Sequence, residues 1–244
     1  MNEFVEGQNP SGLVLPEHFA DWNEEMIQRY DPEIFHHHPR GVVRWVENKR
    51  VKAVLRGLRA APTDRVLDVG CGAGNILARV DAAERHGIDL SKFMVKRAVA
   101  LLADKGKIVQ GNAESLPYAD ASFDCVIASS LLSHVLHPEI VISELKRVTR
   151  SGGRIVISVS QEEQIEKGLA WVRGLGLARF FFGSGKSGSG DGQPPLSQVY
   201  HVDYHLHRFS LKRLRELVGF SLTESSSSNV PFVFPVHAIV VYVR

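Results

Sequence analysis

Short apolar runs recur through the middle of the chain, and segments with helically spaced apolar positions separate them. Continuous apolar runs are typical of strands that lie buried inside a parallel sheet. The runs that predict strands are Arg65–Gly70, Arg85–Leu90, Lys107–Asn112, Phe123–Ser129 and Arg154–Ser160. Because strands and helices alternate, we expect a doubly wound α/β fold with helices on both faces of the sheet.

The segments between these strands predict helices. Valines and leucines at helical spacing predict one from about His38 to Leu58. A helix is expected to begin near Asn75, directly after a glycine-rich turn, and another runs from a Ser91 cap to about Asp104.

A further helix is predicted over Pro138–Arg150, and the pair Gly152-Gly153 is expected to end it. Its apolar side is predicted to comprise Ile140, Val141, Leu145 and Val148. After residue 208 the pattern resumes, with a helix capped by Ser210 and two strands near Ser221–Ser227 and Ala238–Val243.

The segment 161–208 interrupts this rhythm. Glu162–Phe182 is predicted to be helical, Gly183–Gln193 has the composition of a flexible loop, and Tyr200–His207 alternates as in a strand. We expect 1–60 to form a helical lid, 61–160 the α/β core, 161–208 a substrate-binding cap, and 209–244 the completion of the core. The alternative is that 161–208 is a surface segment without a functional role.

Composition narrows the class of protein. The chain has 244 residues, 44% of them hydrophobic and 23% charged, with a formal net charge of +2. This charge is too small to indicate a nucleic-acid partner, and no apolar run is long enough to span a membrane. Cys71 and Cys125 are both expected on core strands in a reducing, cytoplasmic setting.

The turn after the first predicted strand carries the chemistry. It reads Gly70-x-Gly72-x-Gly74, and Asp68 precedes it by two residues. Glycine allows a sharp turn and a close approach of the backbone to a ligand. This spacing differs from the dinucleotide motif G-x-G-x-x-G, and an acid here suits a cation better than a pyrophosphate. A second acid, Asp89, ends the next strand, where ribose hydroxyls are bound in such folds.

Further segments continue the pattern, namely Gly111-Asn112-Ala113-Glu114-Ser115-Leu116-Pro117-Tyr118, Ser122-Phe123-Asp124 and Glu144-Leu145-Lys146-Arg147-Val148. Together with the glycine turn they resemble the class I S-adenosylmethionine (SAM)-dependent methyltransferases, in the branch with the ubiquinone/menaquinone-type C-methyltransferases. The resemblance covers about residues 45–160 and, more loosely, 208–244. It implies a Rossmann-like sheet of seven strands, parallel except for one antiparallel strand near the C-terminus, and SAM as the cofactor.

The resemblance also implies roles for particular residues. Asp68 and the turn would hold the methionine end of SAM, Asp89 the ribose, and Leu90 the adenine face. Asn112, where the family more often has aspartate, would meet the adenine edge with Ala113. The implied cofactor-binding residues are Asp68, Gly70, Cys71, Gly72, Gly74, Asp89, Leu90, Asn112, Ala113, Ser129 and Ser130.

Histidines are the candidates for a general base, which methyl transfer needs only where the acceptor must lose a proton. His134 follows the fourth strand, and His205 lies on the polar face of the alternating segment. A structural histidine and a solvated edge strand are the respective alternatives. No metal site is expected. His36-His37-His38 is interpreted as a solvated helix entry, and Tyr30 and Phe35 are candidates to close over SAM.

We therefore expect an enzyme that methylates a small, hydrophobic or ring-bearing molecule, as a monomer or homodimer. An inactive SAM-binding partner subunit is the alternative, and a nicotinamide or nucleotide-sugar enzyme is disfavoured by the glycine spacing. Gly183–Ser187 resembles the end of a P-loop, but Phe180 stands where that motif needs glycine.

Overall fold

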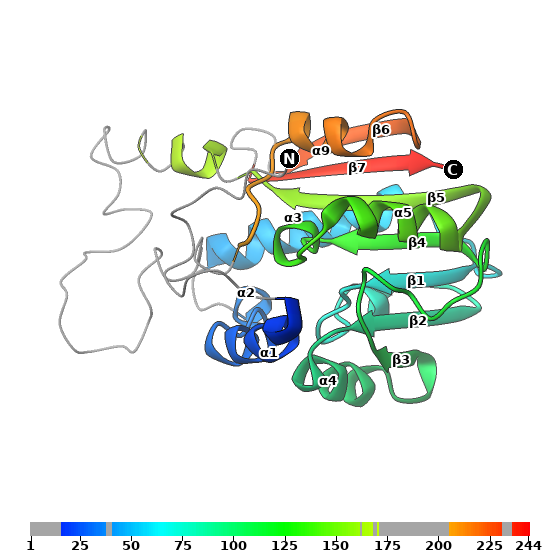
Figure 1. Ribbon diagram of the computed structural model, residues 1–244, viewed down its shortest axis with the longest axis horizontal. Helices are drawn as coiled ribbons and strands as arrows, with labels where there is room; N and C mark the ends of the chain where they lie inside the picture. Colours follow the sequence, from blue (N-terminus) through cyan, green and yellow to red (C-terminus); the bar gives the residue numbers. More distant parts are fainter. Residues whose placement is uncertain (1–15, 38–40, 162, 168–169, 171–204, 231–235) are drawn as a thin grey trace.

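The apolar runs assemble into a seven-stranded sheet in the order β3-β2-β1-β4-β5-β7-β6 (Figure 1). The computed structural model describes residues 16–37, 41–161, 163–167, 170, 205–230 and 236–244. The strands are β1 Arg65–Val69, β2 Glu84–Asp89, β3 Lys107–Gln110, β4 Phe123–Ser129, β5 Thr149–Ser160, β6 Thr223–Val230 and β7 His237–Val243.

Strand direction follows the predicted topology. The pairs β1–β2, β2–β3, β1–β4 and β4–β5 are parallel, whereas β7 runs antiparallel to both β5 and β6. The prediction of one antiparallel strand near the C-terminus is therefore confirmed. The chain order reverses between β1 and β4, so the carboxyl ends of these two strands mark the edge where doubly wound folds bind ligands.

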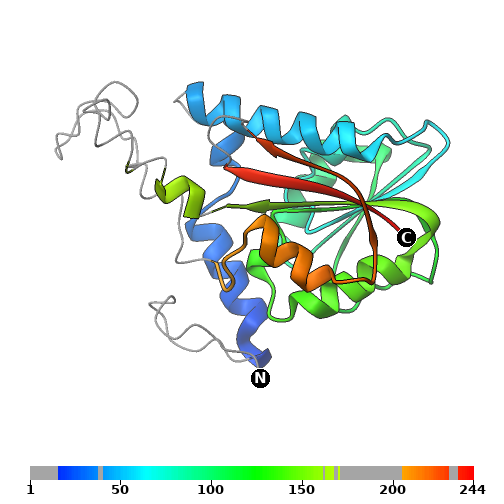
Figure 2. The same cartoon turned by 90° about the horizontal axis from the view of Figure 1, so that it is seen from above.

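Helices cover both faces of the sheet (Figure 2). Helices α3 (Gly41–Leu58) and α4 (Lys92–Leu102) bury apolar side chains against one face, and α5 (Pro138–Val148) and α9 (Leu211–Val218) against the other. Val54 and Leu145 are fully buried, one on each side. Burial of each such side chain contributes about 1.5–3 kcal/mol, so the two helix layers fix the sheet between them.

Helix starts are set by local capping. The Ser91 hydroxyl accepts a hydrogen bond from the Met94 amide at the start of α4, and Ser210 accepts one from Arg213 at the start of α9. Both predicted caps are confirmed. Each satisfies a backbone donor that the first helical turn leaves without a partner.

The prediction of a helix after the glycine turn is wrong. Only a single 3-10 turn, η2 (Leu77–Arg79), stands between β1 and β2. The turn itself occupies residues 70–75, and β2 already begins at Glu84. Too few residues remain for an α-helix and the return to the next parallel strand, so the glycine turn is not followed by an α-helical N-terminus.

Helix α5 differs in two details from its prediction. Ile140 is 41% exposed, and Ile142 is buried in its place. With Pro138 at the first helical position, residues spaced three and four apart from it face the sheet, and Ile140 falls outside that stripe. The helix also ends at Val148 instead of at the glycine pair, because β5 already begins at Thr149.

The N-terminal helices α1 (Phe19–Arg29) and α2 (Ile34–His37) lie at the edge of the sheet where the carboxyl ends of β1 and β2 gather (Figure 1). Short 3-10 turns are η1 (Pro16–His18), η3 (Ala103–Lys105) and η4 (Leu132–His134). In the described part of the chain, no helix combines the length and the apolar character that a membrane crossing requires.

The interrupting segment is described only in part. Residues 163–167 are helical, as predicted, whereas the loop 183–193 and the aromatic residues at 171, 180–182, 200 and 204 lie outside the described residues. A strand was predicted over Tyr200–His207, of which the structure describes His205–His207. These three residues form no strand, so the prediction is wrong for them. Hydrogen bonds of Leu206 and His207 with the segment after β4 hold these residues instead.

Candidate functional site

The glycine turn folds back over the end of β2. The amides of Gly70 and Cys71 both donate to the Ile88 carbonyl, at 2.8 and 3.1 Å. Gly70, Gly72 and Gly74 have φ of +69°, +52° and +83°, which side chains with a Cβ disfavour. Cys71 therefore lies in the turn and not on a core strand, whereas Cys125 is on β4 as predicted.

The three glycines serve different purposes. A Cβ on Gly70 would lie 2.7 Å from the Leu131 side chain, and one on Gly74 would lie 2.7 Å from Leu102 on α4. A Cβ on Gly72 would have no atom within 4 Å. A Cβ at Gly70 or Gly74 would thus press on a neighbouring leucine, while Gly72 faces open space, as expected where a ligand approaches the backbone.

Asp89 organises this turn from the end of β2. One carboxylate oxygen accepts from the Gly72 amide at 2.8 Å, and the other accepts from the Ser91 amide at 3.0 Å. Burial raises the pKa of Asp89, and these amide hydrogen bonds oppose that shift. Each oxygen keeps a further lone pair, so the same carboxylate can accept hydroxyl hydrogen bonds from a ligand.

Asp68 lies at the same edge, on β1, and is buried. Its Oδ1 atom has no hydrogen-bond partner in the described part of the chain. Burial and the neighbouring Asp89 carboxylate raise the pKa of Asp68 to about 8, although Arg50 acts in the opposite direction. Ionising a buried carboxyl group with one oxygen left without a hydrogen bond is costly, and a bound cation such as an ammonium or sulfonium would relieve that cost.

An ion pair that the sequence did not predict lies at this site. On α3, the Arg50 guanidinium donates to both oxygens of Glu47, and it also donates to the Ser129 hydroxyl at the end of β4. Ser129 in turn shares a 2.8 Å hydrogen bond with Ser158 on β5. The only sequence signal was two charged residues three apart on the apolar side of a helix.

Histidines surround this pair. His36 Nε2 lies 3.4 Å from Glu47, and so it is an interior partner and not the solvated residue that was predicted. Burial acts to raise the pKa of Glu47, but the charge and hydrogen bonds of Arg50 lower it to about 2. His237, the first residue of β7, was also missed. Burial and the positive charge of Arg50 lower its pKa to about 3, which keeps it neutral.

The end of β4 lies beside Arg50 and Ser158. Ser130 has φ +55° and donates its amide to the Ser158 carbonyl at 2.9 Å. The strand therefore stops at Ser129, and the chain turns away at the sheet edge. Ser129 and Ser130, two of the implied cofactor-binding residues, thus lie at the carboxyl end of β4.

The predicted adenine-edge residues follow β3. The Gly111 amide donates to the Asp89 carbonyl at 2.9 Å, which ties the start of this loop to β2. Asn112 Oδ1 accepts from the Glu114 amide at 2.9 Å, and Ala113 is buried. Gln110 donates to the Leu90 carbonyl. Leu90, Asn112 and Ala113 therefore lie on adjoining loops, although the Asn112 oxygen already has one partner.

The two candidate bases come together in the structure. The rings of His134 and His205 pack edge to face with centroids 4.7 Å apart. The segment bearing His205 is held by the Leu206 amide, 2.7 Å from the Ser133 carbonyl. His207 turns inward, with Nε2 3.0 Å from the Val135 carbonyl, and burial lowers its pKa. His205 and His207, which the alternation predicts on one polar face, thus have separate partners, the His134 ring and the Val135 carbonyl.

Acidic residues on α1 and on the link between α1 and α2 reach the same loops. Glu24 accepts from the Phe93 amide at 3.2 Å, and Glu33 accepts from the Asn75 side chain at 2.5 Å. Asp31 binds Arg97 at 2.7 Å. These contacts place α1 and α2 beside the turn and the start of α4. Their predicted role as a lid stays a prediction.

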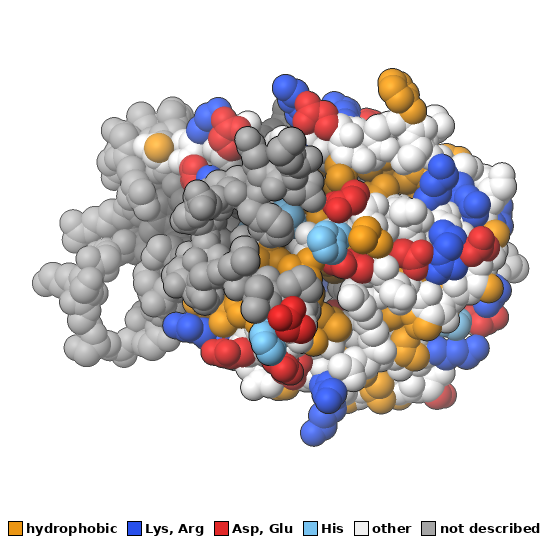
Figure 3. Space-filling view, in the orientation of Figure 1, with side chains coloured by type: hydrophobic (Ala, Val, Ile, Leu, Met, Phe, Trp, Pro, Cys, Tyr) orange, Lys and Arg blue, Asp and Glu red, His pale blue; other side chains and the backbone are white. Residues whose placement is uncertain are grey.

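Apolar, acidic and histidine side chains gather at this edge, next to the segments drawn in grey (Figure 3). Within the described ranges, no three His, Cys, Asp or Glu side chains cluster as ligands for a metal ion. The edge thus offers a buried acid, an open glycine backbone and a pair of imidazoles, which suit a positively charged ligand bearing hydroxyl groups.

A family model described as a methyltransferase domain matches residues 67–157, from β1 to β5. These residues are a class I SAM-dependent methyltransferase domain. SAM is the cofactor of such domains. The domain includes all the implied cofactor-binding residues.

Two curated relatives align with this domain. The ubiquinone/menaquinone biosynthesis C-methyltransferase of Syntrophotalea carbinolica is 35% identical over 112 residues, which cover 43% of this chain and 47% of the relative. The demethylmenaquinone methyltransferase of Beutenbergia cavernae is 38% identical over 109 residues, covering 44% and 45%. The chain thus spans about half the length of the curated relatives it matches.

The likeness of the fold extends further. The structure of magnesium protoporphyrin IX methyltransferase from Synechocystis PCC 6803 with bound S-adenosylhomocysteine (SAH) superposes with a TM-score of 0.63. The match covers 93% of this chain and 97% of that one, at 19% identity. At this identity the likeness concerns the fold of the methyltransferase domain and not its acceptor.

Proposed function

We propose that this protein transfers a methyl group from SAM to a small, hydrophobic, ring-bearing acceptor. The observation that carries the proposal is the buried Asp68 carboxylate, whose Oδ1 has no partner among the described residues, at the edge where Gly72 faces open space. A carboxylate kept at such a cost, beside backbone that a ligand can approach, suits a cationic cofactor.

The donor groups fit SAM. Asp68 would attract its positive charge, and Asp89 would accept hydrogen bonds from the ribose hydroxyls. Leu90, Asn112 and Ala113 would surround adenine, and Ser129 and Ser130 would border the reacting centre. When bound, SAM supplies an activated methyl group on a sulfonium. The protein's own contribution is to align the acceptor and exclude water, and such positioning can supply several kcal/mol.

His134 and His205 would act on the acceptor. An imidazole that takes a proton as the methyl arrives raises the nucleophilicity of an oxygen, nitrogen or acidic carbon. Their ring contact holds both at the carboxyl edge, one from the loop after β4 and one from the end of the inserted segment. We infer that one ring holds the proton and that the other orients it.

The acceptor class rests on the relatives. The two curated relatives described above are named for ubiquinone, menaquinone and demethylmenaquinone. A ring-bearing acceptor of this kind matches the aromatic composition of the inserted segment. The alternative of an inactive SAM-binding subunit is not favoured, because the glycine turn and both acids are intact and the named relatives are methyltransferases.

Calorimetric titration with SAM and SAH tests the cofactor assignment. We expect Asp89→Ala to weaken SAH binding by at least about tenfold, or ~1.4 kcal/mol, because the ribose hydroxyls lose their acceptor. Asp89→Asn, which keeps one oxygen, should weaken it less. Asp104→Ala changes an exposed acid of η3 and is the matched control. Folded wild-type protein that binds neither ligand would contradict the proposed function.

Replacement of the histidines tests the base. With SAM and a panel of naphthoquinols and phenols, we expect His134→Ala and His205→Ala to lower kcat by about 100-fold or more, with unchanged SAH affinity. His137→Ala is the control, since His137 is a partly exposed residue that precedes α5 in the same loop. Equal turnover in all three variants would exclude both histidines from the reaction.

A further inference from the structure

The loop over residues 111–122 joins the parallel strands β3 and β4 without a helix. Leu116 in this loop is buried. A crossover helix satisfies its own backbone groups, whereas an irregular loop packed against a sheet needs partners from elsewhere. The partners of this loop therefore decide where its first residues, Asn112 and Ala113, lie.

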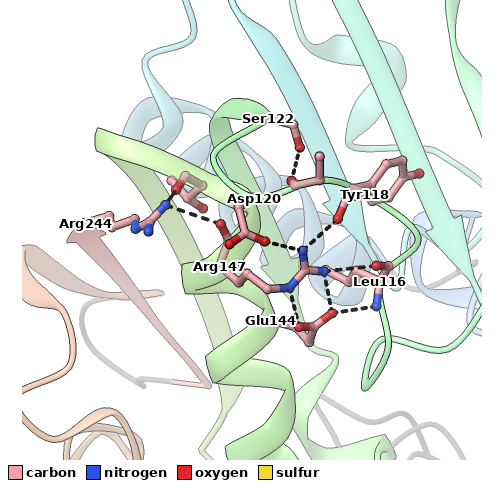
Figure 4. A network of polar contacts seen from close by, with 9 residues as sticks. Leu116, Tyr118, Asp120, Ser122, Glu144, Arg147 and Arg244 are labelled. Atoms are coloured by element: carbon pink, nitrogen blue, oxygen red, sulfur yellow. Dashed lines mark hydrogen bonds and ion pairs between the residues drawn. The ribbon is translucent and has the colours of Figure 1, made fainter.

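Arg147 on α5 supplies most of these partners (Figure 4). Its Nη1 donates to the Tyr118 carbonyl at 2.7 Å and to Asp120 Oδ1 at 2.8 Å. Its Nη2 donates to the Leu116 carbonyl at 3.0 Å and to Glu144 at 2.8 Å, and its Nε donates to Glu144 at 2.6 Å. These five hydrogen bonds occupy all the donors of a guanidinium.

Glu144, one helical turn earlier on α5, binds the same loop. Arg147 and Glu144 together are called the clamp. Its Oε2 accepts from the Leu116 amide at 2.7 Å, so that both backbone groups of Leu116 are bound by this one ion pair. Hydrogen bonds from Arg147 lower the pKa of Glu144, which keeps the carboxylate charged at neutral pH. The Ala121 amide also donates to the Arg147 carbonyl, at 2.9 Å.

The clamp reaches the cofactor edge through a short chain of contacts. Glu114 accepts from the His137 amide at 2.9 Å, next to the start of α5. The Glu114 amide in turn donates to Asn112 Oδ1. The loop is thus fastened to β2 at Gly111, to the start of α5 at Glu114, and to the C-terminal half of α5 at Leu116 and Tyr118.

We propose that Arg147 and Glu144 are positioning residues that set the selectivity of the cofactor site for adenine, by fixing the backbone that carries Asn112 and Ala113. This inference rests on the proposed SAM site. Neither side chain need touch the cofactor. A planar guanidinium with five directed donors holds four carbonyl or carboxylate groups in one register, which a lysine ammonium with one nitrogen cannot do.

The test compares two ligands that differ only at the base. SAH carries the exocyclic amine of adenine, and S-inosylhomocysteine carries an oxygen in its place. We expect wild-type protein to prefer SAH, and we expect Arg147→Lys to weaken SAH by about tenfold while S-inosylhomocysteine changes less than about twofold. The ratio of the two Kd values should therefore fall towards one. Glu144→Gln, which keeps an acceptor for the Leu116 amide, should give a smaller fall.

The matched control is Arg215→Lys. Arg215 makes a similar two-pronged pair with Glu224, on α9 and β6. It should leave both Kd values unchanged. Thermal unfolding of each variant establishes that it is folded, and Glu144→Gln carries the test if Arg147→Lys does not fold.

The outcomes separate this inference from the proposed function. Wild-type protein that binds neither ligand would contradict the SAM site itself. Wild-type binding with no preference for adenine, unchanged affinities in the variants, or equal weakening of both ligands would overturn the positioning role. Loss of the preference in Arg147→Lys and Glu144→Gln, but not in Arg215→Lys, would support it.

Discussion

Asp68→Asn is expected to make the ligand-free protein more stable at alkaline pH and, at the same time, to weaken SAM binding about 100-fold or more. The carboxylate is buried, and its Oδ1 has no partner among the described residues. Asparagine has nearly the same shape but no charge. The substitution therefore removes the cost of burying the charge together with the attraction for a cationic ligand.

The pH dependence gives this prediction its sign. In the unfolded chain an aspartate titrates near pH ~3.9. Burial and Asp89 raise the pKa of Asp68 to about 8 in the folded protein. Ionisation of Asp68 therefore opposes folding, by an amount that is absent at low pH, grows as pH rises through the interval between the two pKa values, and is constant above the folded pKa.

Urea unfolding at pH 5.5 and 8.5 measures this effect. The stability of wild-type protein relative to Asp68→Asn should fall by roughly 3 kcal/mol between the two pH values. Asp124→Asn is the control with the opposite sign. A hydrogen bond from the Arg65 amide and the charge of Arg150 lower the pKa of Asp124, so its removal should destabilise the protein at pH 8.5.

Binding completes the test of Asp68. Calorimetry at pH 7.5 should find SAM and SAH much weaker for Asp68→Asn than for wild-type protein, while Asp124→Asn binds both normally. If the free energy of unfolding of Asp68→Asn depended on pH as strongly as that of wild-type protein, the Asp68 carboxylate would not be the group that opposes folding. Retained affinity would remove it from the cofactor site.

Gly72→Ala is expected to reduce SAH affinity about 100-fold or more with a stability loss of only about 1–2 kcal/mol. The stability loss is the cost of a Cβ at φ +52°. No atom lies within 4 Å of that Cβ, so the folded turn can hold it. The Cβ would, however, stand in the space that the proposed ligand needs beside the backbone.

Gly74→Ala is the comparison for this prediction. Its Cβ would press on Leu102 at 2.7 Å and on Ala98 at 3.4 Å, both on α4, at φ +83°. Overpacking adds about 1–3 kcal/mol to the backbone cost, so this variant should be the less stable of the two. Urea unfolding and SAH calorimetry on both variants should therefore rank them in opposite orders. The same rank order in both measurements would mean that Gly72 is needed for packing and not for a ligand.

Sequence alone predicted the features that depend on neighbouring residues. The limits of β4 agree with its apolar run, because that run is buried on both faces, and Ser91 and Ser210 cap their helices because the bonded amides lie three residues away. The glycine turn and Asp89 were predictable for the same reason. The chain must turn between β1 and β2, and Asp89 ends the adjacent strand.

Only the tertiary structure decided which distant side chains meet. Arg50 reaches Ser129 across 79 positions, and His205 reaches His134 from the far end of the inserted segment. Neither contact has a local signal, because it depends on how α3 and the inserted segment pack against the sheet edge. The helix wrongly expected near Asn75 has the same explanation. Local propensity allowed it, whereas the short return from β1 to β2 left it no room.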